Sequence, residues 1–524
     1  MLTVRGISVS PDRDGPEAVR RGAAEALGVT PGKLETVRVL RRSIDARKKS
    51  AVRIIYTAEV SLPGEDMILR RGLKNVSAAG EERFVPGPAL VPAARPVVTG
   101  FGPAGMFAAL VLAEAGLRPV VLERGEPVER RREAVRRFRE TGVLDPESNV
   151  QFGEGGAGTF SDGKLHSGVG GSRSRWVLQR FAEFGAPEEI LTDAMPHVGT
   201  DILEGVVRRI RERVTELGGE VRFSTKLTGI RTENGRVAGA ETAGDVVPCT
   251  HLILAVGHSA RDTVEALFAC GIPMEPKAFS MGVRIEHLQR DVDAAQYGAF
   301  AGHPALGPAP YRLSCRLPDG ESAYTFCMCP GGYVIAAASE TGGVVTNGMS
   351  YSGRSGENAN SALLVTLGPE KFPHPGALSG MAWQRELERS AFLAGGENYH
   401  APVQRSGDFL ARRPSAGPGR VVPTYRPGVV WCDLHHVLPG VITGTLEKAI
   451  PALGRYLRGF DDPDAVLTAP ETWSSSPVRI LRDGALQSAV RGLYPCGEGA
   501  GYAGGIISAA VDGIRCAEAV LRGG

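Results

Sequence analysis

The sequence predicts an α/β protein whose main part is a discontinuous, Rossmann-like dinucleotide-binding domain. An apolar run ends in Gly-x-Gly-x-x-Gly at residues 97–105, and a helical apolar pattern follows it. A second apolar run then ends in an acid, Glu123. Strand, glycine turn, helix, strand and acid in this order are typical of a βαβ unit that binds a dinucleotide.

Five segments divide the chain in this prediction. They are a small α+β N-terminal domain at 1–85, a linker at 86–96, the first part of the dinucleotide-binding domain at 97–274, an inserted mixed α+β substrate domain at 275–475, and the C-terminal part of the dinucleotide-binding domain at 476–524. The boundaries follow changes in apolar periodicity and a Pro/Ala-rich stretch before residue 97.

The N-terminal segment shows strand patterns at 2–9, 34–40 and 51–62 and a helical pattern at 16–27. This order predicts a helix packed on a small sheet. The basic stretch at 41–49 is interpreted as a solvated hairpin tip. The alternative is a patch that binds phosphate groups of a partner or of RNA.

The composition excludes several classes of function. Basic and acidic residues leave a net charge of only +2, so neither nucleic acid nor a membrane is expected as a partner. No apolar run reaches the ~20 residues that cross a bilayer, and the first residues lack a signal-peptide pattern, so we expect a cytoplasmic location. The cysteines and histidines form no zinc-binding pattern, so we expect no metal site.

The glycines of the fingerprint have separate roles. Gly100 permits the tight turn, Gly102 lets the backbone approach a pyrophosphate, and Gly105 lets helix and strand pack closely. Pro103 suits the first helical turn, whose free N–H groups face the phosphates. Glu123 is expected to accept hydrogen bonds from a ribose. The predicted cofactor contacts here are Gly100, Gly102, Pro103, Ala104, Gly105, Glu123 and Arg124.

Two segments after the fingerprint extend the predicted cofactor site. A basic helix is expected at 127–139, and we assign its Arg131 to the pyrophosphate. The glycine-rich run at 149–165 is expected to be approached closely by a flat or anionic ligand. The predicted contacts in this run are Gly155, Gly156, Ala157, Gly158 and Thr159, and Asp162 and Lys164 are the nearest polar groups.

Two later segments are expected to return to the same sheet. The pattern at residues 250–261 predicts a buried strand, after which Gly257 is expected to lie near the cofactor. Residues 492–507 read as a strand, a glycine turn and a carboxylate, and the helix that follows could direct its positive end at the ligand. The predicted contacts are Gly257, Gly497, Glu498, Gly504, Gly505 and Ile506.

Cys327 and Cys329 stand two residues apart in a predicted strand of the inserted domain. We expect their side chains to lie on opposite faces of that strand. On this expectation they are buried structural thiols beside a Pro-Gly-Gly turn, and redox or metal chemistry is the alternative.

Together these motifs resemble the FAD-binding oxidoreductases built like glutathione reductase and p-hydroxybenzoate hydroxylase. The chain is more closely similar to a bacterial family of uncharacterised FAD-dependent dehydrogenases, a likeness carried by residues 43–49, 149–165, 326–332, 474–480 and 494–513. The resemblance implies FAD as cofactor, with the fingerprint on its ADP half. It also implies that Gly497-Glu498, where Gly-Asp is usual, lies at the ribityl chain.

The resemblance implies an FAD-dependent oxidoreductase that transfers a hydride between an organic substrate and flavin. No second fingerprint is found, so a transient NAD(P)H or another electron donor or acceptor is expected to act beside the small-molecule substrate. Lys164, His258 and Arg479 are the catalytic candidates, chosen because they flank cofactor motifs. The alternative is a flavin-containing RNA- or protein-binding module in which FAD is structural or sensory.

Overall fold

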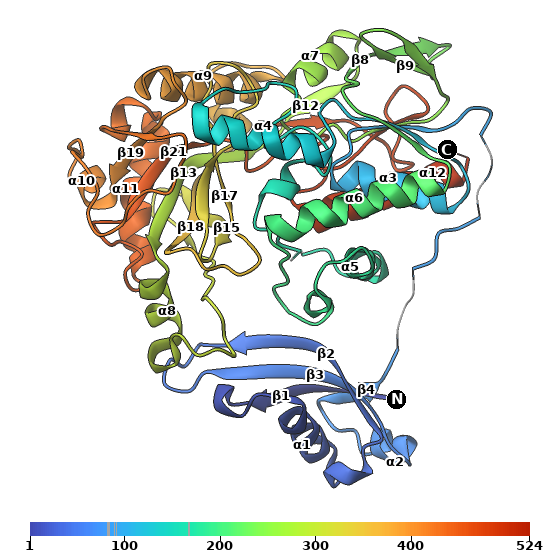
Figure 1. The fold of residues 1–524 in the computed structure, drawn as a ribbon, viewed down its shortest axis with the longest axis vertical. Helices are drawn as coiled ribbons and strands as arrows, with labels where there is room; N and C mark the ends of the chain where they lie inside the picture. The colour runs from blue at the N-terminus through green and yellow to red at the C-terminus, as the bar shows by residue number, and fades with distance from the viewer. Residues whose placement is uncertain (81–83, 89, 91, 166–167, 524) are drawn as a thin grey trace.

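A computed structural model describes residues 1–80, 84–88, 90, 92–165 and 168–523 (Figure 1). Parts of the predicted N-terminal domain (81–83) and linker (89 and 91) lie outside these residues, as do 166, 167 and 524. The prediction of an α/β protein is confirmed, because strands and helices alternate through the chain. The five predicted segment boundaries stay predictions.

A five-stranded, all-parallel sheet, here called the parallel sheet, carries the fingerprint. Its strand order is β7-β6-β5-β11-β23, so two strands that are distant in sequence rejoin the fingerprint strand. The strands are β5 (Val97–Thr99), β6 (Val120–Leu122), β7 (Glu220–Arg222), β11 (Leu252–Leu254) and β23 (Leu493–Pro495). The order reverses at β5, and a ligand in such a sheet binds beyond the carboxyl ends of the strands at this point.

Alternate residues of the short buried strands face two different layers. Val98, Val121 and Ile253 pack against helices, among which α3, α6 and α12 lie side by side. Val97 and Leu252 pack against a three-stranded antiparallel sheet on the other face. The helical layer consists of α3 (Pro103–Glu114), α5 (Ser172–Glu183), α6 (Thr200–Glu216) and α12 (Ile506–Leu521). The other layer consists of β8 (Leu227–Glu233), β9 (Arg236–Thr242) and β10 (Val246–Pro248), together with α7 (Arg261–Ala269).

A seven-stranded sheet, the large sheet, lies beside the parallel sheet (Figure 1). Its order is β14-β15-β18-β13-β21-β19-β20, and every residue of the two central strands β13 and β21 is buried. Its strands are β13 (Phe279–Leu288), β14 (Ser314–Arg316), β15 (Ser322–Cys329), β18 (Asn358–Leu367), β19 (Ala401–Arg405), β20 (Val429–Trp431) and β21 (Val466–Glu471). Helices α9 (Ser379–Ala394), α10 (Ser406–Leu410) and α11 (Gly440–Gly454) accompany it.

Several smaller elements lie in the chain between the strands of these sheets. They are α4 (Val128–Thr141), α8 (Gln289–Tyr297), and the two-stranded pairs β12 (Met274–Pro276) with β22 (Val478–Ile480) and β16 (Tyr333–Ala336) with β17 (Thr346–Met349). One-turn 3₁₀ helices lie at Pro11–Arg13, Pro31–Lys33, Ala157–Phe160, Glu188–Leu191, Gly298–Phe300, Pro369–Lys371 and Leu434–His436. No helix in the described residues is long and apolar enough to cross a membrane.

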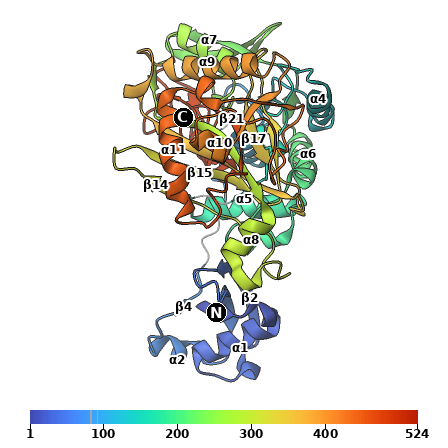
Figure 2. The same cartoon turned by 90° about the vertical axis from the view of Figure 1, so that its left-hand side faces the viewer.

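The N-terminal unit forms a separate layer, drawn in blue at the bottom of both views (Figure 2). Its antiparallel sheet has the order β2-β3-β1-β4, and α1 packs on it. Its elements are β1 (Leu2–Val9), α1 (Pro16–Leu27), β2 (Thr36–Asp45), β3 (Arg53–Ser61), α2 (Glu65–Arg70) and β4 (Val76–Ala78).

The basic hairpin of this unit is less solvated than predicted. The backbone of Arg42 exchanges hydrogen bonds with Thr192 and Ala194, each 2.8 Å long. Lys49 Nζ donates to Gln296 Oε1 of α8 at 2.9 Å. The prediction of a solvated tip therefore fits Arg47, whose side chain is 89% exposed, but not the hairpin as a whole.

Candidate functional site

A cavity of about 700 Å³ lies beyond the carboxyl ends of the parallel strands and reaches the large sheet. Its wall combines the fingerprint turn, residues 151–161, residues 255–260, β15, residues 471–475 and residues 496–509. Segments from both sheets therefore face one space, and that space lies where an α/β sheet of this order binds its ligand.

Three fingerprint glycines differ in what requires them. Gly100 has a φ of 91°, and a side chain there would clash with the carbonyl oxygen of Ala255. A side chain at Gly105 would clash with the carbonyl oxygen of Gly100, so Gly105 serves helix–strand packing. Gly102 has an ordinary φ of −78°, and a Cβ there would meet only Gly156 Cα, at 3.6 Å. The fold itself therefore does not require a glycine at 102. A side chain there would instead occupy space in the cavity.

Glu123 links the fingerprint turn to the first part of the glycine-rich run, residues 149–158, here called the glycine loop. Its carboxylate accepts hydrogen bonds from the backbone N–H of Phe101 at 2.7 Å and from those of Gly125 and Gly153 at 2.9 Å. The side chain lines the cavity although it is only 4% exposed. This carboxylate therefore fixes the shape of the cavity wall, and the predicted ribose contact stays a prediction.

Arg131 holds the glycine loop from behind, and the prediction that it reaches a pyrophosphate is not supported. It is fully buried and lies outside the described cavity lining. Its guanidinium donates to five carbonyl oxygens, those of Asn149, Val150, Gly153, Glu154 and Gly156. Burial lowers the pKa of Arg131 to about 10, so it stays charged at neutral pH. Its donors are committed to the loop, and none is left for a phosphate.

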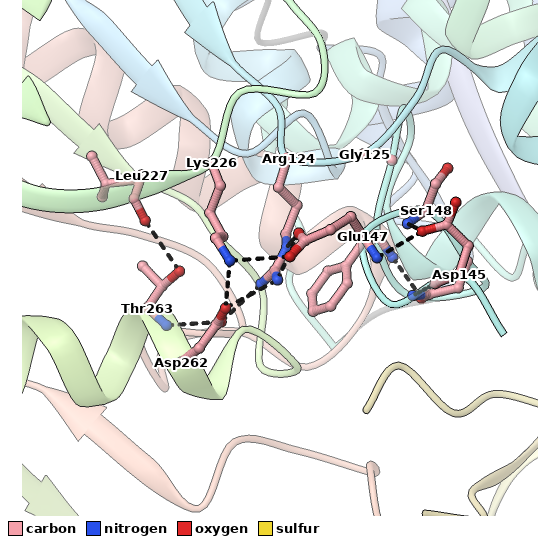
Figure 3. A network of polar contacts seen from close by, with 12 residues as sticks. Arg124, Gly125, Asp145, Glu147, Ser148, Lys226, Leu227, Asp262 and Thr263 are labelled. Atoms are coloured by element: carbon pink, nitrogen blue, oxygen red, sulfur yellow. Dashed lines mark hydrogen bonds and ion pairs between the residues drawn. The ribbon is translucent and has the colours of Figure 1, made fainter. Parts of the chain in front are cut away.

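Arg124 joins a charge network at the rim of the cavity (Figure 3). Its guanidinium donates to Glu147 at 2.9 Å and to both Asp262 oxygens at 2.9 and 3.1 Å. Lys226 Nζ bridges the same two carboxylates at 3.0 and 3.1 Å. The Arg124 guanidinium also lies 3.8 Å over the ring of Phe152. Two carboxylates already neutralise these two cations, so their attraction for an anionic ligand is weak.

His258 and Glu498 lie side by side in the cavity wall. His258 Nδ1 lies 3.4 Å from Glu498 Oε1, and the imidazole packs edge-on against Trp473. Burial raises the pKa of Glu498 to about 7 and lowers the pKa of His258 to about 4. His258 Nε2 is buried without a hydrogen-bond partner among the described residues. At neutral pH the imidazole is neutral, and the carboxyl group can both hold and release a proton.

Lys164 lies in a buried cluster of charges. The Asp162 carboxylate is fully buried and accepts from Arg354 at 2.8 and 3.2 Å, and Lys164 Nζ lies 3.3 Å from it. Burial alone would lower the pKa of Lys164, but the Asp162 charge outweighs burial and raises that pKa. Lys164 Nζ also donates to Cys329 Sγ at 3.8 Å. The cavity therefore contains a lysine that remains cationic.

Arg284 and Glu471 were missed by the sequence analysis. Arg284 is fully buried in β13 and forms a two-pronged ion pair with Glu471 at 2.9 and 3.0 Å. Its Nη1 donates to the carbonyl oxygen of Cys327 at 2.9 Å. Both residues lie in strands in which every residue is buried, and a charged residue within a largely apolar run is a signal that the sequence offered.

The expectation that Cys327 and Cys329 lie on opposite faces rests on a wrong premise about strands, and the strand itself is not regular at this point. Residues two apart on a regular strand share a face. In addition, β15 bulges between Phe326 and Cys329, where its pairing with β18 shifts by one residue. Cys327 is half-buried and lines the cavity, whereas Cys329 is fully buried beside Lys164.

The predicted site residues separate into two groups. Those on the cavity wall are Gly100, Gly102, Pro103, Ala104, Glu123, Arg124, Gly156, Ala157, Gly158, Lys164, Gly257, His258, Glu498, Gly504, Gly505 and Ile506. Those outside the described lining are Gly105, Arg131, Gly155, Thr159, Gly497 and Arg479. Gly155 and Gly497 instead use their backbone N–H groups within the fold, on Phe101 and Asp512. Arg479 pairs with Glu275 at 3.4 Å, which removes the support for a catalytic role.

The wall fits a dinucleotide better than a compact ligand. Its fingerprint side presents backbone, the N-terminus of α3 and a glycine whose missing side chain leaves space. Its other side presents the N-terminus of α12, where Gly504, Gly505 and Ile506 line the cavity. Two helix N-termini on one cavity suit a ligand with negative charge at more than one position.

Comparison with known proteins finds one relative of nearly equal length. An "Uncharacterized protein" of Clostridium beijerinckii is 45% identical over 535 residues, which cover 99% of this chain and 98% of that protein. Residues 278–474 match the model of the family "FAD-dependent protein, C-terminal domain-like", and residues 1–61 match a domain of unknown function, DUF8436.

Solved structures resemble the chain more distantly. A triple mutant of the flavin-dependent brominase Bmp2 is 12% identical, with a TM-score of 0.36 over 82% of this chain and 80% of that one. L-proline dehydrogenase from P. horikoshii is 12% identical, with a TM-score of 0.34 over 83% and 95%. A geranylgeranyl bacteriochlorophyll reductase-like protein from Thermoplasma acidophilum is 14% identical, with a TM-score of 0.35 over 81% and 77%.

Proposed function

We propose that this chain, which belongs to the family of FAD-dependent proteins matched at residues 278–474, is an oxidoreductase that passes a hydride between a small organic substrate and flavin. Its cofactor is FAD. One observation carries the proposal. A single cavity joins the dinucleotide fingerprint to Lys164, His258 and Glu498, which come from three distant segments. A purely structural cofactor would need the dinucleotide fingerprint, but it would not need the three ionisable side chains.

The residues that would hold FAD are those of the cavity wall. The backbone around Gly102 and the first turn of α3 would receive the pyrophosphate, with Glu123 near the adenosine ribose. Glu498 and the first turn of α12 would lie toward the other half of the molecule. When bound, FAD would supply a reversible acceptor for two electrons.

The chain's own residues would then prepare the site for the substrate. Lys164, kept charged by Asp162, would favour negative charge in the cavity. Glu498 would hold or release a proton for the substrate, because its pKa of about 7 is suited to both, and the neutral His258 imidazole 3.4 Å away would position its carboxyl group. Trp473 and Phe326 line the cavity and would exclude water.

The alternative of an RNA- or protein-binding module has less support. Arg42 and Lys49 of the basic hairpin contact the body of the protein, which leaves fewer cations for a partner. A transient reductant such as NAD(P)H stays part of the proposal, because only one dinucleotide fingerprint is found in the sequence.

Anaerobic reduction of the bound flavin tests the proposal. The holoprotein is mixed with NADH, NADPH and panels of alcohols, amines and hydroxy acids, and flavin absorbance is followed. At least one compound should bleach the flavin, and Lys164→Met and Glu498→Gln should slow bleaching by about 10²–10⁴-fold, the scale of a lost acid–base group. Arg479→Met is the matched control and should be unchanged, since Arg479 lies off the cavity wall. Equal rates in all variants would contradict the assigned roles.

A further inference from the structure

The backbone at Cys327 has a conformation that residues other than glycine rarely adopt. Its φ is +45°, in the left-handed region. The bulge in β15 lies at the same place. Strain of this kind is concentrated at functional sites, and bulges often redirect a side chain beside such a site.

Buried groups hold this strained segment in place. Arg284 Nη1 donates to the carbonyl oxygen of Cys327 at 2.9 Å, and Glu471 fixes the guanidinium on its other side. The thiol of Cys329 donates to the same carbonyl oxygen at 3.3 Å. The two cysteines are therefore linked through hydrogen bonds and not only through the chain.

The spacing of the two cysteines in a bulged strand is compatible with a disulfide. Residues two apart on a regular strand lie roughly 6.7 Å apart, which is the upper limit of about 6.8 Å between the Cα atoms of a disulfide. A bulge bends the strand and shortens this path.

The charges around the pair favour a thiolate at Cys327. The hydrogen bond from Cys329, followed by the charges of Lys164 and Arg284, lowers the pKa of Cys327 well below that of an ordinary thiol. The same pairing and burial raise the pKa of Cys329. Elsewhere in the chain, burial raises the pKa of Cys249 to about 12 and that of Cys432 to about 11. A thiolate beside a protonated thiol is the arrangement that reacts in thiol–disulfide chemistry.

The two thiols differ in access to the cavity. Cys327 lines the cavity together with Lys164 and Glu498, whereas Cys329 is completely buried behind it. An accessible thiol beside a buried resolving thiol is typical of redox-active pairs.

We propose that Cys327 and Cys329 form a reversible disulfide that exchanges electrons with the FAD of the same cavity. Forming the S–S bond from the Cys327 thiolate and the Cys329 thiol breaks one S–H bond and releases two electrons and one proton, which oxidised FAD would accept to become the anionic reduced form. The reverse reaction returns the thiolate and the thiol. The inference rests on FAD occupying the cavity, but it requires no particular organic substrate. The pair would be a second redox centre between flavin and an external disulfide or thiol.

The disulfide itself is tested by mass spectrometry of the full-length holoprotein. The protein is equilibrated in thiol–disulfide buffers, quenched with acid, unfolded in guanidinium chloride in the presence of N-ethylmaleimide so that the buried Cys329 is also reached, and digested with trypsin. Residues 317–354 form one tryptic peptide that contains both cysteines and no other. Under oxidising buffers it should escape alkylation and recover both thiols on reduction. Cys327→Ser and Cys329→Ser should abolish this protection, and Cys270→Ser, at an exposed cysteine elsewhere, should preserve it. Full alkylation of the wild-type peptide in every buffer would overturn the proposal.

Electron exchange is tested by anaerobic titration of the oxidised holoprotein with dithionite. Wild-type protein should take up about two two-electron equivalents per FAD, whereas Cys327→Ser and Cys329→Ser should take up about one. A disulfide that forms in the first experiment but leaves wild-type uptake at one equivalent would overturn exchange with the flavin. Failure of every organic substrate to bleach the flavin would count against the proposed function and leave both of these readouts intact.

Discussion

Residues between 100 and 104 and between 151 and 158, many of them glycines, form much of one end of the cavity, whereas side chains of Lys164, Cys327 and Glu498 line the other. At the first end, here called the fingerprint end, the charged residues Glu123 and Arg131 bind backbone groups of the protein itself. At the second end, the side-chain end, charged residues line the open space. The shape of the fingerprint end suits it to hold a ligand, whereas the ionisable side chains of the other end can stabilise charge on the ligand or exchange protons with it.

This difference explains why charge alone identifies neither end. The strongly basic α4 contributes no arginine to the described cavity lining, and its most buried one, Arg131, supports the loop. The side-chain end instead uses a few cations that are each paired with a buried acid, as Lys164 and Arg354 are with Asp162. Three substitutions test the comparison, from the largest expected effect to the smallest.

Arg131→Met should cause the largest loss of stability. Five carbonyl oxygens, in four buried hydrogen bonds and one part-buried one, lose their donors at once, so the free energy of unfolding should fall by about 3–5 kcal/mol. Arg132→Met on the same helix is the matched control, because that side chain is 67% exposed and pairs only with Glu204. It should change the free energy by less than about 0.5 kcal/mol. Similar urea midpoints for the two variants would mean that the glycine loop does not depend on Arg131.

Glu498→Gln should have an intermediate effect that depends on pH. In the folded protein, burial raises the pKa of Glu498 from its ordinary 4.5 to about 7. Between these values the folded state holds a proton that the unfolded state has lost, so wild-type stability falls as the pH rises toward 7. Glutamine cannot ionise. From pH 5 to pH 8 the variant should therefore gain stability relative to wild type, by roughly 1–3 kcal/mol.

Thermal unfolding of both proteins across this pH range measures the effect. Glu275→Gln is the control, because that side chain is 47% exposed and should show no such trend. A difference between Glu498→Gln and wild type that does not change with pH would place Glu498 in a more solvated setting than the structure shows.

Lys226→Met should have the smallest effect of the three. Lys226 is partly exposed and shares Glu147 and Asp262 with Arg124, which retains both contacts (Figure 3). The affinity for FAD should change by less than about 1 kcal/mol, and the change should shrink as salt is added. A loss of affinity beyond about tenfold, measured by flavin fluorescence, would instead indicate direct contact with the ligand.

The fingerprint end was largely predictable because its signals are local in sequence. The turn at Gly100–Gly105, the acid at Glu123 and the late strand and helix each follow from a short pattern, and all lie at the parallel sheet. Arg131 was misplaced because a periodic pattern shows which residues share a helix face but not which carbonyl oxygens lie opposite that face.

The side-chain end could not be predicted in the same way. Lys164, Arg284 and Cys329 come together only after β13, β15 and the glycine-rich run pack against one another. The bulge at Cys327 depends on the pairing of β15 with β18, which no short pattern in either strand reveals. Asp162 and Lys164 were recognised as polar groups near the ligand, but their partner Arg354 lies 192 residues away from Asp162 in the chain.

The central claim is that the cavity of about 700 Å³ holds FAD with its pyrophosphate against Gly102. Gly102→Leu tests it most directly, because the protein itself leaves room for a Cβ at this position. Gly32→Leu, at an exposed glycine of the N-terminal unit, is the matched control. FAD released on denaturation is quantified against protein. We predict about one FAD per chain in wild type and control and none in Gly102→Leu, with the circular dichroism spectrum unchanged. Normal FAD content in Gly102→Leu would contradict the assignment of this cavity.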